Sequence, residues 1–404
     1  MNILIIDDDF FVLKLLGRQL ANLGYPQVTV CQQAVDAMGI IENASTPFDL
    51  LFCDIQMPEL DGVELLRQIA QHGFRGGLVL MSGEDERILH AVSYLAQAHK
   101  LRVLNAFTKP VKPEQLQRIL EQQLSFVVRE TAPAKKVYGP DEVRHAIHNG
   151  ELVNYYQPKV SSRTGEVVGV ETLVRWQHPV DGLVFPDQFI TTAEQSRLID
   201  DLTRVVLINA LKQCRGWRDD GLDLSVAVNI SMNNLNSLDF PDFIVDVART
   251  AAVELPKLVL EITESQLMNN PVTALDILTR LRLKHITLSI DDFGTGHSSL
   301  RQLRDIAFNE LKVDAGFVHG ASQSPSQRAI LRASVDMARG LGMQSVAEGV
   351  ENADDWNFLL DLDLCDIMQG YFIARPMPAS AMKDWMQEWE MRRHDLMAGI
   401  GRNG

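Results

Sequence analysis

Short apolar runs alternate with amphipathic segments in the first part of the chain. The runs at residues 3–6, 50–53, 78–81 and 103–107 have the length and composition of buried strands. Segments with helical spacing lie between them, for example at residues 11–23 and 62–71. Strands that alternate with helices form parallel βαβ units. The pattern therefore predicts an α/β domain over residues 1–124.

A break in this pattern separates the first domain from the rest. Residues 125–140 are polar, contain proline and end in Gly139-Pro140, which favours a linker. The alternation then resumes over a length that is typical of a (β/α)8 barrel. We therefore expect a TIM-like (β/α)8 barrel over residues 141–395 and a disordered tail at residues 396–404.

Polar residues repeatedly follow the apolar runs of the second domain. The carboxyl ends of parallel strands share one face, and the active sites of such folds gather there. Six endings of this kind, five of them acidic, should therefore converge. They are Glu171, Asn229, Glu261, Asp291, Asp314 and Glu348.

The adjacent acids Asp291 and Asp292 follow the apolar run at residues 286–290. Two neighbouring carboxylates raise each other's pKa unless a cation neutralises them. Glycines after the pair let the backbone turn sharply and approach a ligand. Taken alone, the stretch fits either a divalent metal site at the mouth of a barrel or an acidic surface turn.

Composition narrows the possible partners. The formal net charge is −15, which argues against DNA binding and against attraction to anionic membranes, because both need a positive field. The four cysteines are far apart and form no CxxC pair, so reduced thiols in a cytoplasmic protein are expected. The sequence contains no apolar window long enough for a transmembrane helix, so membrane insertion is not expected.

The polar strand ends of the second domain supply oxygen ligands. Hard divalent cations such as Mg²⁺ and Mn²⁺ prefer all-oxygen sites. Asp292 adjoins Asp291, so this pair can bridge to a second metal. Two metals can clamp the attacking and leaving oxygens of a phosphoryl displacement. The expected ligands of two Mg²⁺ or Mn²⁺ ions are Glu171, Asn229, Glu261, Asp291 and Asp292.

Further residues suit the hydrolysis of a phosphate ester. Glu348 follows a later strand and is the natural general base. Lys312 can orient the nucleophilic water or balance the charge of the acids. Arg175 can bind a phosphate as a planar fork. The residues therefore predict a metal-dependent hydrolase of a phosphate ester, with Glu348, Lys312 and Asp292 as its catalytic groups.

The motifs of the second domain resemble a known family. They are, in order, Glu171-Thr172-Leu173 with Arg175-Trp176, Asn229-Ile230-Ser231, Glu261-Ile262-Thr263-Glu264, residues 291–300, Leu311-Lys312-Val313-Asp314, Glu348-Gly349-Val350-Glu351 and Gln369-Gly370-Tyr371. Residues 138–390 thereby resemble EAL-domain phosphodiesterases, which open cyclic di-GMP to the linear dinucleotide. The resemblance implies substrate contacts by Gln157, Arg175 and Gln369. It also implies a loop braced by Glu264 and a homo-oligomer, a dimer or larger, formed through this domain.

Four positions depart from the pattern of that family, and none of them is an expected metal ligand or the base. Thr172 replaces a small apolar residue, and His297 replaces a tyrosine. Leu364 replaces a glycine, and Ile373 lies where an aromatic residue is frequent. His297 and Ile373 can affect loop dynamics or guanine stacking, so they bear on the turnover rate more than on the chemistry.

Polar residues also end the strands of the first domain. Asp7 and Asp8 follow one strand, Asp54 another, and Ser82 and Lys109 the last two. Such a set can form an acyl-phosphate site with one Mg²⁺ bound by the three acids. Asp54 is then the nucleophile that accepts the phosphoryl group. Lys109 pairs with the phosphoryl charge, and Ser82 donates a hydrogen bond to it.

These strand ends also resemble a known family. The motifs are Ile5-Ile6-Asp7-Asp8-Asp9, Asp54-Ile55-Gln56-Met57-Pro58 with Asp61-Gly62, Met81-Ser82-Gly83 and Thr108-Lys109-Pro110. They resemble a response-regulator receiver domain, which implies a flavodoxin-like (βα)5 fold and a sensor histidine kinase as partner. Ala106 occupies the position of the family's switch aromatic, and Phe107 lies beside it, so the way in which phosphorylation is transmitted stays open.

Together the two domains predict a two-component response regulator that hydrolyses cyclic di-GMP. We expect phosphorylation of Asp54 to modulate this activity. The alternative is a cyclic di-GMP receptor or signalling scaffold with little turnover. Proteins of that kind usually lack a metal ligand or the base, whereas this sequence has the full set. A DNA-binding regulator fits poorly, because the chain is acidic and has no basic helix-turn-helix segment.

Overall fold

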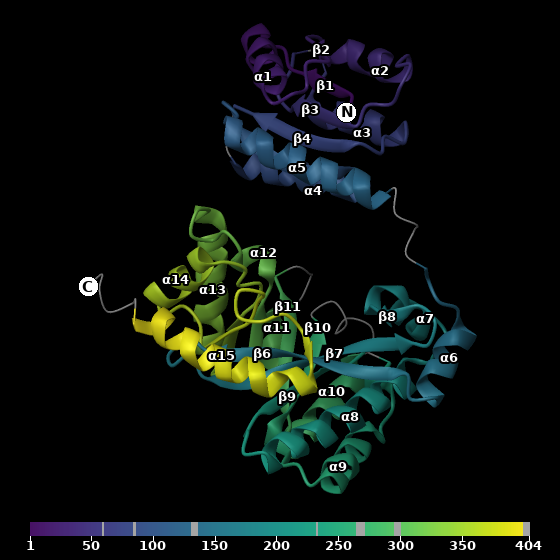
Figure 1. The fold of residues 1–404 in the computed structure, drawn as a ribbon, viewed down its shortest axis with the longest axis vertical. Helices are drawn as coiled ribbons and strands as arrows, with labels where there is room; N and C mark the ends of the chain where they lie inside the picture. Colours follow the sequence, from purple (N-terminus) through teal and green to yellow (C-terminus); the bar gives the residue numbers. More distant parts are fainter. Residues whose placement is uncertain are drawn as a thin grey trace. The chain divides into compact units, whose positions relative to one another are not determined.

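The computed structural model describes residues 1–58, 60–83, 86–130, 136–231, 233–263, 271–294 and 300–398. These residues belong to two compact units, Met1–Ala134 and Lys135–Gly404. Each unit combines a β-sheet with covering helices (Figure 1).

The first unit alternates strands and helices, as the sequence predicts. Its elements are β1 (Ile3–Ile6), α1 (Phe10–Asn22), β2 (Val28–Cys31), α2 (Ala34–Glu42), β3 (Leu50–Asp54), α3 (Gly62–Gln71), β4 (Gly77–Ser82), α4 (Glu86–Ala98), β5 (Arg102–Thr108) and α5 (Pro113–Glu130). The strand order is β2-β1-β3-β4-β5, and every pairing is parallel. This is the flavodoxin-like order, so the predicted (βα)5 fold is confirmed.

Alternate side chains of this sheet form two apolar cores. Leu4 and Ile6 of β1 belong to the core that includes residues of α2, α3 and α4, whereas Ile3 and Ile5 belong to the core that includes residues of α1 and α5. Strands that are buried on both faces read as continuous apolar runs. The crevice of such a sheet lies at the carboxyl ends of the strands where the order reverses, here between β1 and β3.

The second unit is a barrel with helices outside it. Its helices are α6 (Pro140–His148), α7 (Ile190–Gln195), α8 (Ile199–Asp219), α9 (Phe240–Ala251), α10 (Pro271–Leu283), α11 (Leu300–Asp305), α12 (Ala315–Val318), α13 (Pro325–Gly340), α14 (Ala353–Asp361) and α15 (Ala379–Ala398). Its strands are β6 (Leu152–Ser161), β7 (Val167–His178), β8 (Gly182–Val184), β9 (Ser225–Asn229), β10 (Leu258–Thr263), β11 (Thr287–Phe293), β12 (Glu310–Val313), β13 (Gln344–Ala347), β14 (Ile367–Met368) and β15 (Met377–Pro378). Short 3₁₀ turns lie at Pro186–Gln188, Asn234–Asn236 and Leu255–Lys257.

The barrel closes through β6, which pairs with both β7 and β14. The neighbours from β7 through β9 to β14 are parallel, so the predicted TIM-like barrel is confirmed. One strand differs from an all-parallel barrel, because β6 is antiparallel to β7 and β14 and also to the short strand β15. A short turn joins β6 to β7, and Gly165 in it has a φ of +68°. Only antiparallel strands can be joined by so short a connection.

Residues near the predicted boundaries are ordered elements of the two units. Helix α5 continues to Glu130, within the stretch predicted as a linker. Tyr138 is 1% exposed and belongs to the barrel core, where its ring lies 4.5 Å from that of Trp176. Helix α15 continues to Ala398, and the last six residues lie outside the described part of the chain.

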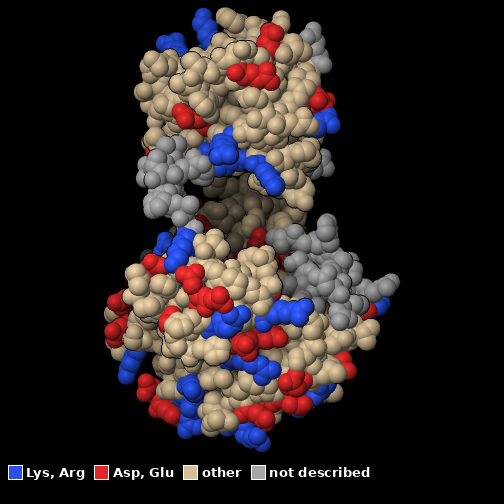
Figure 2. Space-filling view, turned by 90° about the vertical axis from the view of Figure 1, so that its right-hand side faces the viewer, with Lys and Arg blue, Asp and Glu red and all other residues tan. Residues whose placement is uncertain are grey.

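Charged side chains of both signs lie on the surface of the barrel unit, whereas the cysteines are internal. On the face shown in Figure 2, acidic and basic side chains are interspersed over the barrel unit and form no continuous basic patch. All four cysteines are buried and free. Within the described residues, no helix is long and apolar enough to cross a membrane.

Candidate active site

An acidic cluster lies at the carboxyl ends of β1 and β3 in the first unit. The Nζ of Lys109 is 2.7 Å from Oδ2 of Asp7 and 2.7 Å from Oδ2 of Asp54. Carboxylate oxygens of Asp7, Asp8 and Asp54 lie within 4.8 Å of one another. The Ser82 hydroxyl is 3.5 Å from the side-chain oxygen of Gln56, beside the same edge. The structure thus brings together the residues that the sequence predicts as a phosphorylation site.

A larger cluster lies inside the barrel, around the Lys312 ammonium of β12. Lys312 is 1% exposed, and four carboxylates surround its Nζ. The distances from Nζ are 2.8 Å to Glu348, 3.0 Å to Asp291, 3.3 Å to Glu261 and 3.7 Å to Glu171. The predicted convergence of the strand ends is therefore present for these residues.

A bulge brings the adjacent acids of β11 to the same place. Successive residues of a regular strand point to opposite faces. The register with β12 shifts between Ile290 and Phe293, and Asp292 has a φ of +56°. A bulge re-aims the side chains next to it. As a result, oxygens of Asp291, Asp292 and Glu348 lie within 4.8 Å of one another.

Amide side chains hold the Glu171 carboxylate in place. Its Oε1 accepts a hydrogen bond of 2.9 Å from Nδ2 of Asn229 at the end of β9. Its Oε2 accepts one of 2.7 Å from Nε2 of Gln369. The same nitrogen is 3.1 Å from Oε1 of Gln157, so both predicted substrate-binding glutamines border the acids.

The electrostatics of the cluster show an excess of negative charge. Burial raises the pKa of Glu348 to about 8; Lys312 lowers it in part, and Asp291 and Glu171 raise it further. Burial also raises the pKa of Glu171 and that of Asp292, with neighbouring carboxylates adding to the effect. Carboxylates that share a site ionise together only when a cation neutralises them. The cluster therefore has the charge that a metal site requires.

Glu261 is the exception among these acids. Burial would raise its pKa, but Lys159 and Lys312 outweigh burial and hold the pKa at about 2. Its carboxylate is therefore charged at neutral pH even though the residue is 0% exposed. A charged oxygen ligand is thus available in the barrel interior.

The donor atoms fit Mg²⁺ or Mn²⁺ in both units. The described candidates are carboxylate and amide oxygens, which are the ligands that hard cations select. In the barrel the residues that could hold a cation are Glu171, Asn229, Glu261, Asp291 and Asp292, and Glu348 lies in the same cluster. In the first unit the residues that could hold a cation are Asp7, Asp8 and Asp54.

A hollow of about 230 Å³ opens beside the barrel acids. Gln157, Glu171, Glu348, Gln369 and Tyr371 are among the residues that line it. A cavity of this kind, with convergent polar groups, is the usual form of a small-molecule site. It gives a ligand direct access to the acid cluster.

Other predicted residues lie around the acid cluster or outside the described chain. Arg175 of β7 is stacked on two rings, with its guanidinium 5.0 Å from the Phe185 centroid and 5.6 Å from that of Tyr155. Asp314 caps α12 by accepting a hydrogen bond from the Gly316 amide.

The positions that depart from the family pattern lie mostly in the interior. Ile373 is 2% exposed and belongs to the apolar core. Thr172 and Leu364 are also buried, whereas Glu264 and His297 lie outside the described residues.

Sequence reasoning missed three buried polar residues beneath the acids. They are Lys159 of β6, Ser289 of β11 and Glu310 of β12. Each lies two residues from a predicted site residue in its own strand, namely Gln157, Asp291 and Lys312. Side chains two apart share a face of a strand, so this spacing was the available signal.

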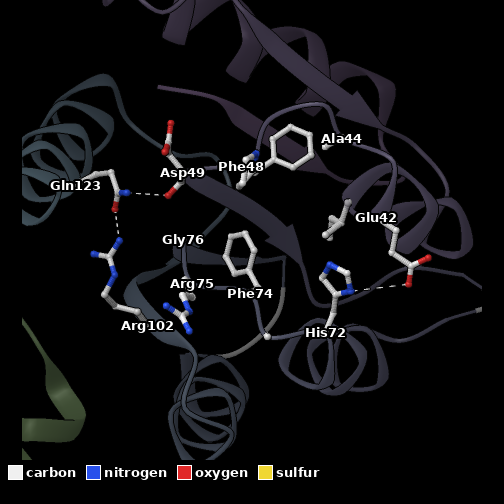
Figure 3. Close-up of a pocket in the computed structure, with 13 residues that line it drawn as sticks. Glu42, Ala44, Phe48, Asp49, His72, Phe74, Arg75, Gly76, Arg102 and Gln123 are labelled. Carbon is white, nitrogen blue, oxygen red and sulfur yellow. Dashed lines mark hydrogen bonds and ion pairs between the residues drawn. The ribbon is translucent and has the colours of Figure 1, made fainter. Parts of the chain in front are cut away.

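A hollow of about 450 Å³ in the first unit is larger but lies away from the acid cluster of that unit. Its lining residues Asp49, Gly76 and Arg102 lie at the amino ends of β3, β4 and β5, whereas Asp54 lies at a carboxyl end (Figure 3). Its polar groups bond one another: Gln123 joins Arg102 to the Asp49 carbonyl, and His72 lies 4.0 Å from Glu42. We therefore assign this hollow no part in the chemistry.

Comparison with known families agrees with this geometry. The EAL domain matches residues 141–376, which is more than half of the chain. The chain belongs to the EAL domain family. The response regulator receiver domain matches residues 3–121. The two resemblances that the motifs predict are thus confirmed.

Several EAL proteins are similar to this chain over different extents. Cyclic di-GMP phosphodiesterase RocR of Pseudomonas aeruginosa is 30% identical over 388 residues, which cover 95% of this chain and 98% of RocR. Cyclic di-GMP phosphodiesterase PdeR of Escherichia coli is 38% identical over 250 residues, which cover 62% of this chain and only 38% of PdeR. The solved structure of the PaMucR phosphodiesterase in complex with c-di-GMP is 39% identical, with a TM-score of 0.57, and the match covers 60% of this chain and 98% of that one.

Proposed function

We propose that this chain hydrolyses one phosphodiester bond of cyclic di-GMP to give the linear dinucleotide. The observation that carries the proposal is the set of four carboxylates around the buried Lys312, beside an accessible hollow. Membership of the EAL family, and the similarity to RocR and PdeR, support this substrate.

The expected metal ligands divide between four strands. Glu171, Asn229, Glu261, Asp291 and Asp292 would hold two Mg²⁺ or Mn²⁺ ions. When bound, these ions supply positive charge that stabilises phosphoryl transfer. Gln157 and Gln369 border the hollow and would contact the dinucleotide, and Arg175 would bind a phosphate.

Glu348 would act as the general base. It takes a proton from the attacking water as the water oxygen bonds to phosphorus. The bond from phosphorus to the departing sugar oxygen breaks, and that oxygen takes up a proton from solvent. Lys312, 2.8 Å from Glu348, keeps the carboxylate close to the other acids and can orient the water.

Incubation of the purified full chain with cyclic di-GMP and Mg²⁺ or Mn²⁺ tests the proposal. We expect the linear dinucleotide as product, and we expect Glu348→Gln to abolish it. Asp336→Asn, at an exposed position on α13, is the control and should keep the activity. Binding of cyclic di-GMP without any product would instead favour the receptor or scaffold alternative.

The first unit would regulate this activity. Asp54 would accept a phosphoryl group from a sensor histidine kinase, with one Mg²⁺ held by Asp7, Asp8 and Asp54. Lys109, 2.7 Å from Asp54, would pair with the phosphoryl charge, and Ser82 would donate a hydrogen bond to it. Beryllofluoride, a mimic of the phosphoryl group, should change the rate of hydrolysis. Equal rates with and without it would refute this part of the proposal.

Other expectations stay predictions. They are a cytoplasmic location, assembly into a homo-oligomer through the EAL domain, no binding to DNA, and a loop braced by Glu264. A molecular mass measured in solution tests the assembly. A Glu264→Gln variant tests the loop through its effect on hydrolysis.

A further inference from the structure

A second polar layer lies directly beneath the acid cluster of the barrel. Lys159, Ser289 and Glu310 are 4%, 0% and 4% exposed. Lys159 is paired in register with Gly169, two residues before Glu171 in β7, which places it deeper than the acids. Buried polar side chains of this kind are expensive unless they bond one another.

The layer is a bonded chain. The Ser289 hydroxyl donates a hydrogen bond of 2.8 Å to Oε1 of Glu310. The same Glu310 oxygen lies 3.3 Å from Nζ of Lys159. Ser289 and Glu310 are also neighbours in the register of β11 and β12. Glu310 thus has two partners, Ser289 and Lys159, and its contact with Lys159 lies on the side away from the acid cluster.

Lys159 reaches up from this layer to a predicted metal ligand. Its Nζ donates a hydrogen bond of 2.8 Å to Oε1 of Glu261. The other oxygen of Glu261, Oε2, lies 3.3 Å from Nζ of Lys312. One lysine therefore contacts each oxygen of this carboxylate, which fixes both its position and the plane in which it lies.

We propose that Lys159 is a positioning residue that, supported by Glu310 and Ser289, holds the Glu261 carboxylate in the orientation that metal binding requires. Partners of this kind orient ligands, and their loss typically weakens metal binding about 10- to 100-fold. The inference rests on the proposed metal-dependent function. The competing explanation is that Lys159 only neutralises buried charge.

A double variant distinguishes the positioning of the Glu261 carboxylate from the neutralisation of buried charge. Lys159→Met with Glu310→Gln removes one positive and one negative charge, so the net charge beneath the acids is unchanged. Titration calorimetry of the metal-free full chain with Mn²⁺ alone measures the affinity without any turnover. Every protein compared, including the reference called wild type in this test, also carries Asp8→Asn, which removes a candidate ligand of the first unit so that the titration reports on the barrel site. We expect binding at least about 10-fold weaker than in the wild type. Wild-type affinity in the folded double variant would overturn the proposal.

Two further variants keep the test decisive. Val335→Ala truncates a buried residue of α13 and controls for lost stability; it should keep its Mn²⁺ affinity. Ser289→Ala removes only the hydrogen bond to Glu310 and should weaken Mn²⁺ binding less, by about two- to tenfold. If the double variant does not fold, the Ser289→Ala variant is the deciding test. An Mn²⁺ affinity of Ser289→Ala equal to that of the wild type then overturns the proposal.

The same titrations keep the inference separate from the proposed function. A wild type that binds Mn²⁺ but does not hydrolyse cyclic di-GMP refutes the proposed function, and the variants still decide the role of Lys159. A wild type that binds no Mn²⁺ refutes both. A wild type that hydrolyses cyclic di-GMP, with a double variant of equal affinity, refutes only the positioning role.

Discussion

The Nζ of Lys312 lies 2.8 Å from Oε1 of Glu348, at the centre of the acid cluster inside the barrel. Three more carboxylates lie within 4.0 Å of the same ammonium group. Burial of so many acids is tolerated only when cations neutralise them. Lys312 is therefore the cation that these four carboxylates share, and Lys159 adds a second cation at Glu261.

Replacement of Lys312 by methionine should expose this dependence. Removal of one partner from a buried ion pair typically costs about 3–5 kcal/mol. We expect the Tm in chelator to fall by several degrees, and added Mn²⁺ to raise it more than in the wild type. Hydrolysis of cyclic di-GMP should also fall strongly. Scanning calorimetry with chelator and with Mn²⁺ measures the first two effects.

The control for Lys312→Met is Lys257→Met. Lys257 forms a pair of 2.7 Å with Asp223 at the surface, where its side chain is 33% exposed. Surface pairs contribute little to stability. The control should therefore change the Tm by less than Lys312→Met does, and similar losses in both variants would contradict the central role of Lys312.

The stability of the metal-free protein should depend on pH through Glu348. Its pKa is raised to about 8, so the folded protein keeps this proton at a pH where the unfolded chain has already lost it. Stability therefore falls as pH rises from about 4.5 toward 8. Glu171 and Asp292, whose pKa values are also raised, act in the same direction. Glu261, with a pKa of about 2, is charged throughout this window.

Tm measurements in chelator between pH 5 and pH 8.5 test this dependence. The wild type should lose stability as pH rises, and Glu348→Gln should lose less because the glutamine has no proton to release. The conservative shape of glutamine keeps the packing comparable. Equal slopes for the two proteins would show that Glu348 does not carry the effect.

The bulge at Asp292 predicts different effects for two substitutions. The φ of +56° is tolerated by asparagine and aspartate but is strained for a β-branched residue. Asp292→Asn should therefore keep or raise the Tm in chelator, because it removes a repelling charge, yet it should weaken Mn²⁺ binding and hydrolysis. Asp292→Val should lower the Tm as well. Calorimetry together with a hydrolysis assay separates the two, and an equal Tm in both variants would argue against strain.

Much of the acid cluster could be predicted because its residues follow apolar runs. Glu171, Glu261 and Glu348 are visible in the sequence as polar interruptions at strand ends. The contacts between them could not be predicted in detail. The bulge brings the carboxylates of Asp291 and Asp292 close to the same cluster. It depends on the register between β11 and β12, which the local sequence does not define.

Two other features could not be read from the strand-end rule. The antiparallel direction of β6 follows from its short turn to β7, whereas alternating strands and helices alone indicate an all-parallel barrel. Lys159 and Glu310 lie inside strands, where a charged residue in an alternating pattern usually indicates a solvent-facing side. Their burial is explained by pairing across the barrel, because Lys159 contacts both Glu310 and Glu261, which lie 151 and 102 positions away in the sequence.

The position of the Lys109 ammonium group leads to a prediction for the first unit. It is 2.7 Å from the buried carboxylates of both Asp7 and Asp54, so Lys109→Met leaves these acids facing each other without that cation. We expect a lower Tm for this unit in chelator, partial recovery with Mg²⁺, and loss of the change in hydrolysis rate that beryllofluoride causes. Lys112→Met, at an exposed position three residues away, should keep both the Tm and the response. A full response in Lys109→Met would show that Asp54 communicates with the barrel without Lys109.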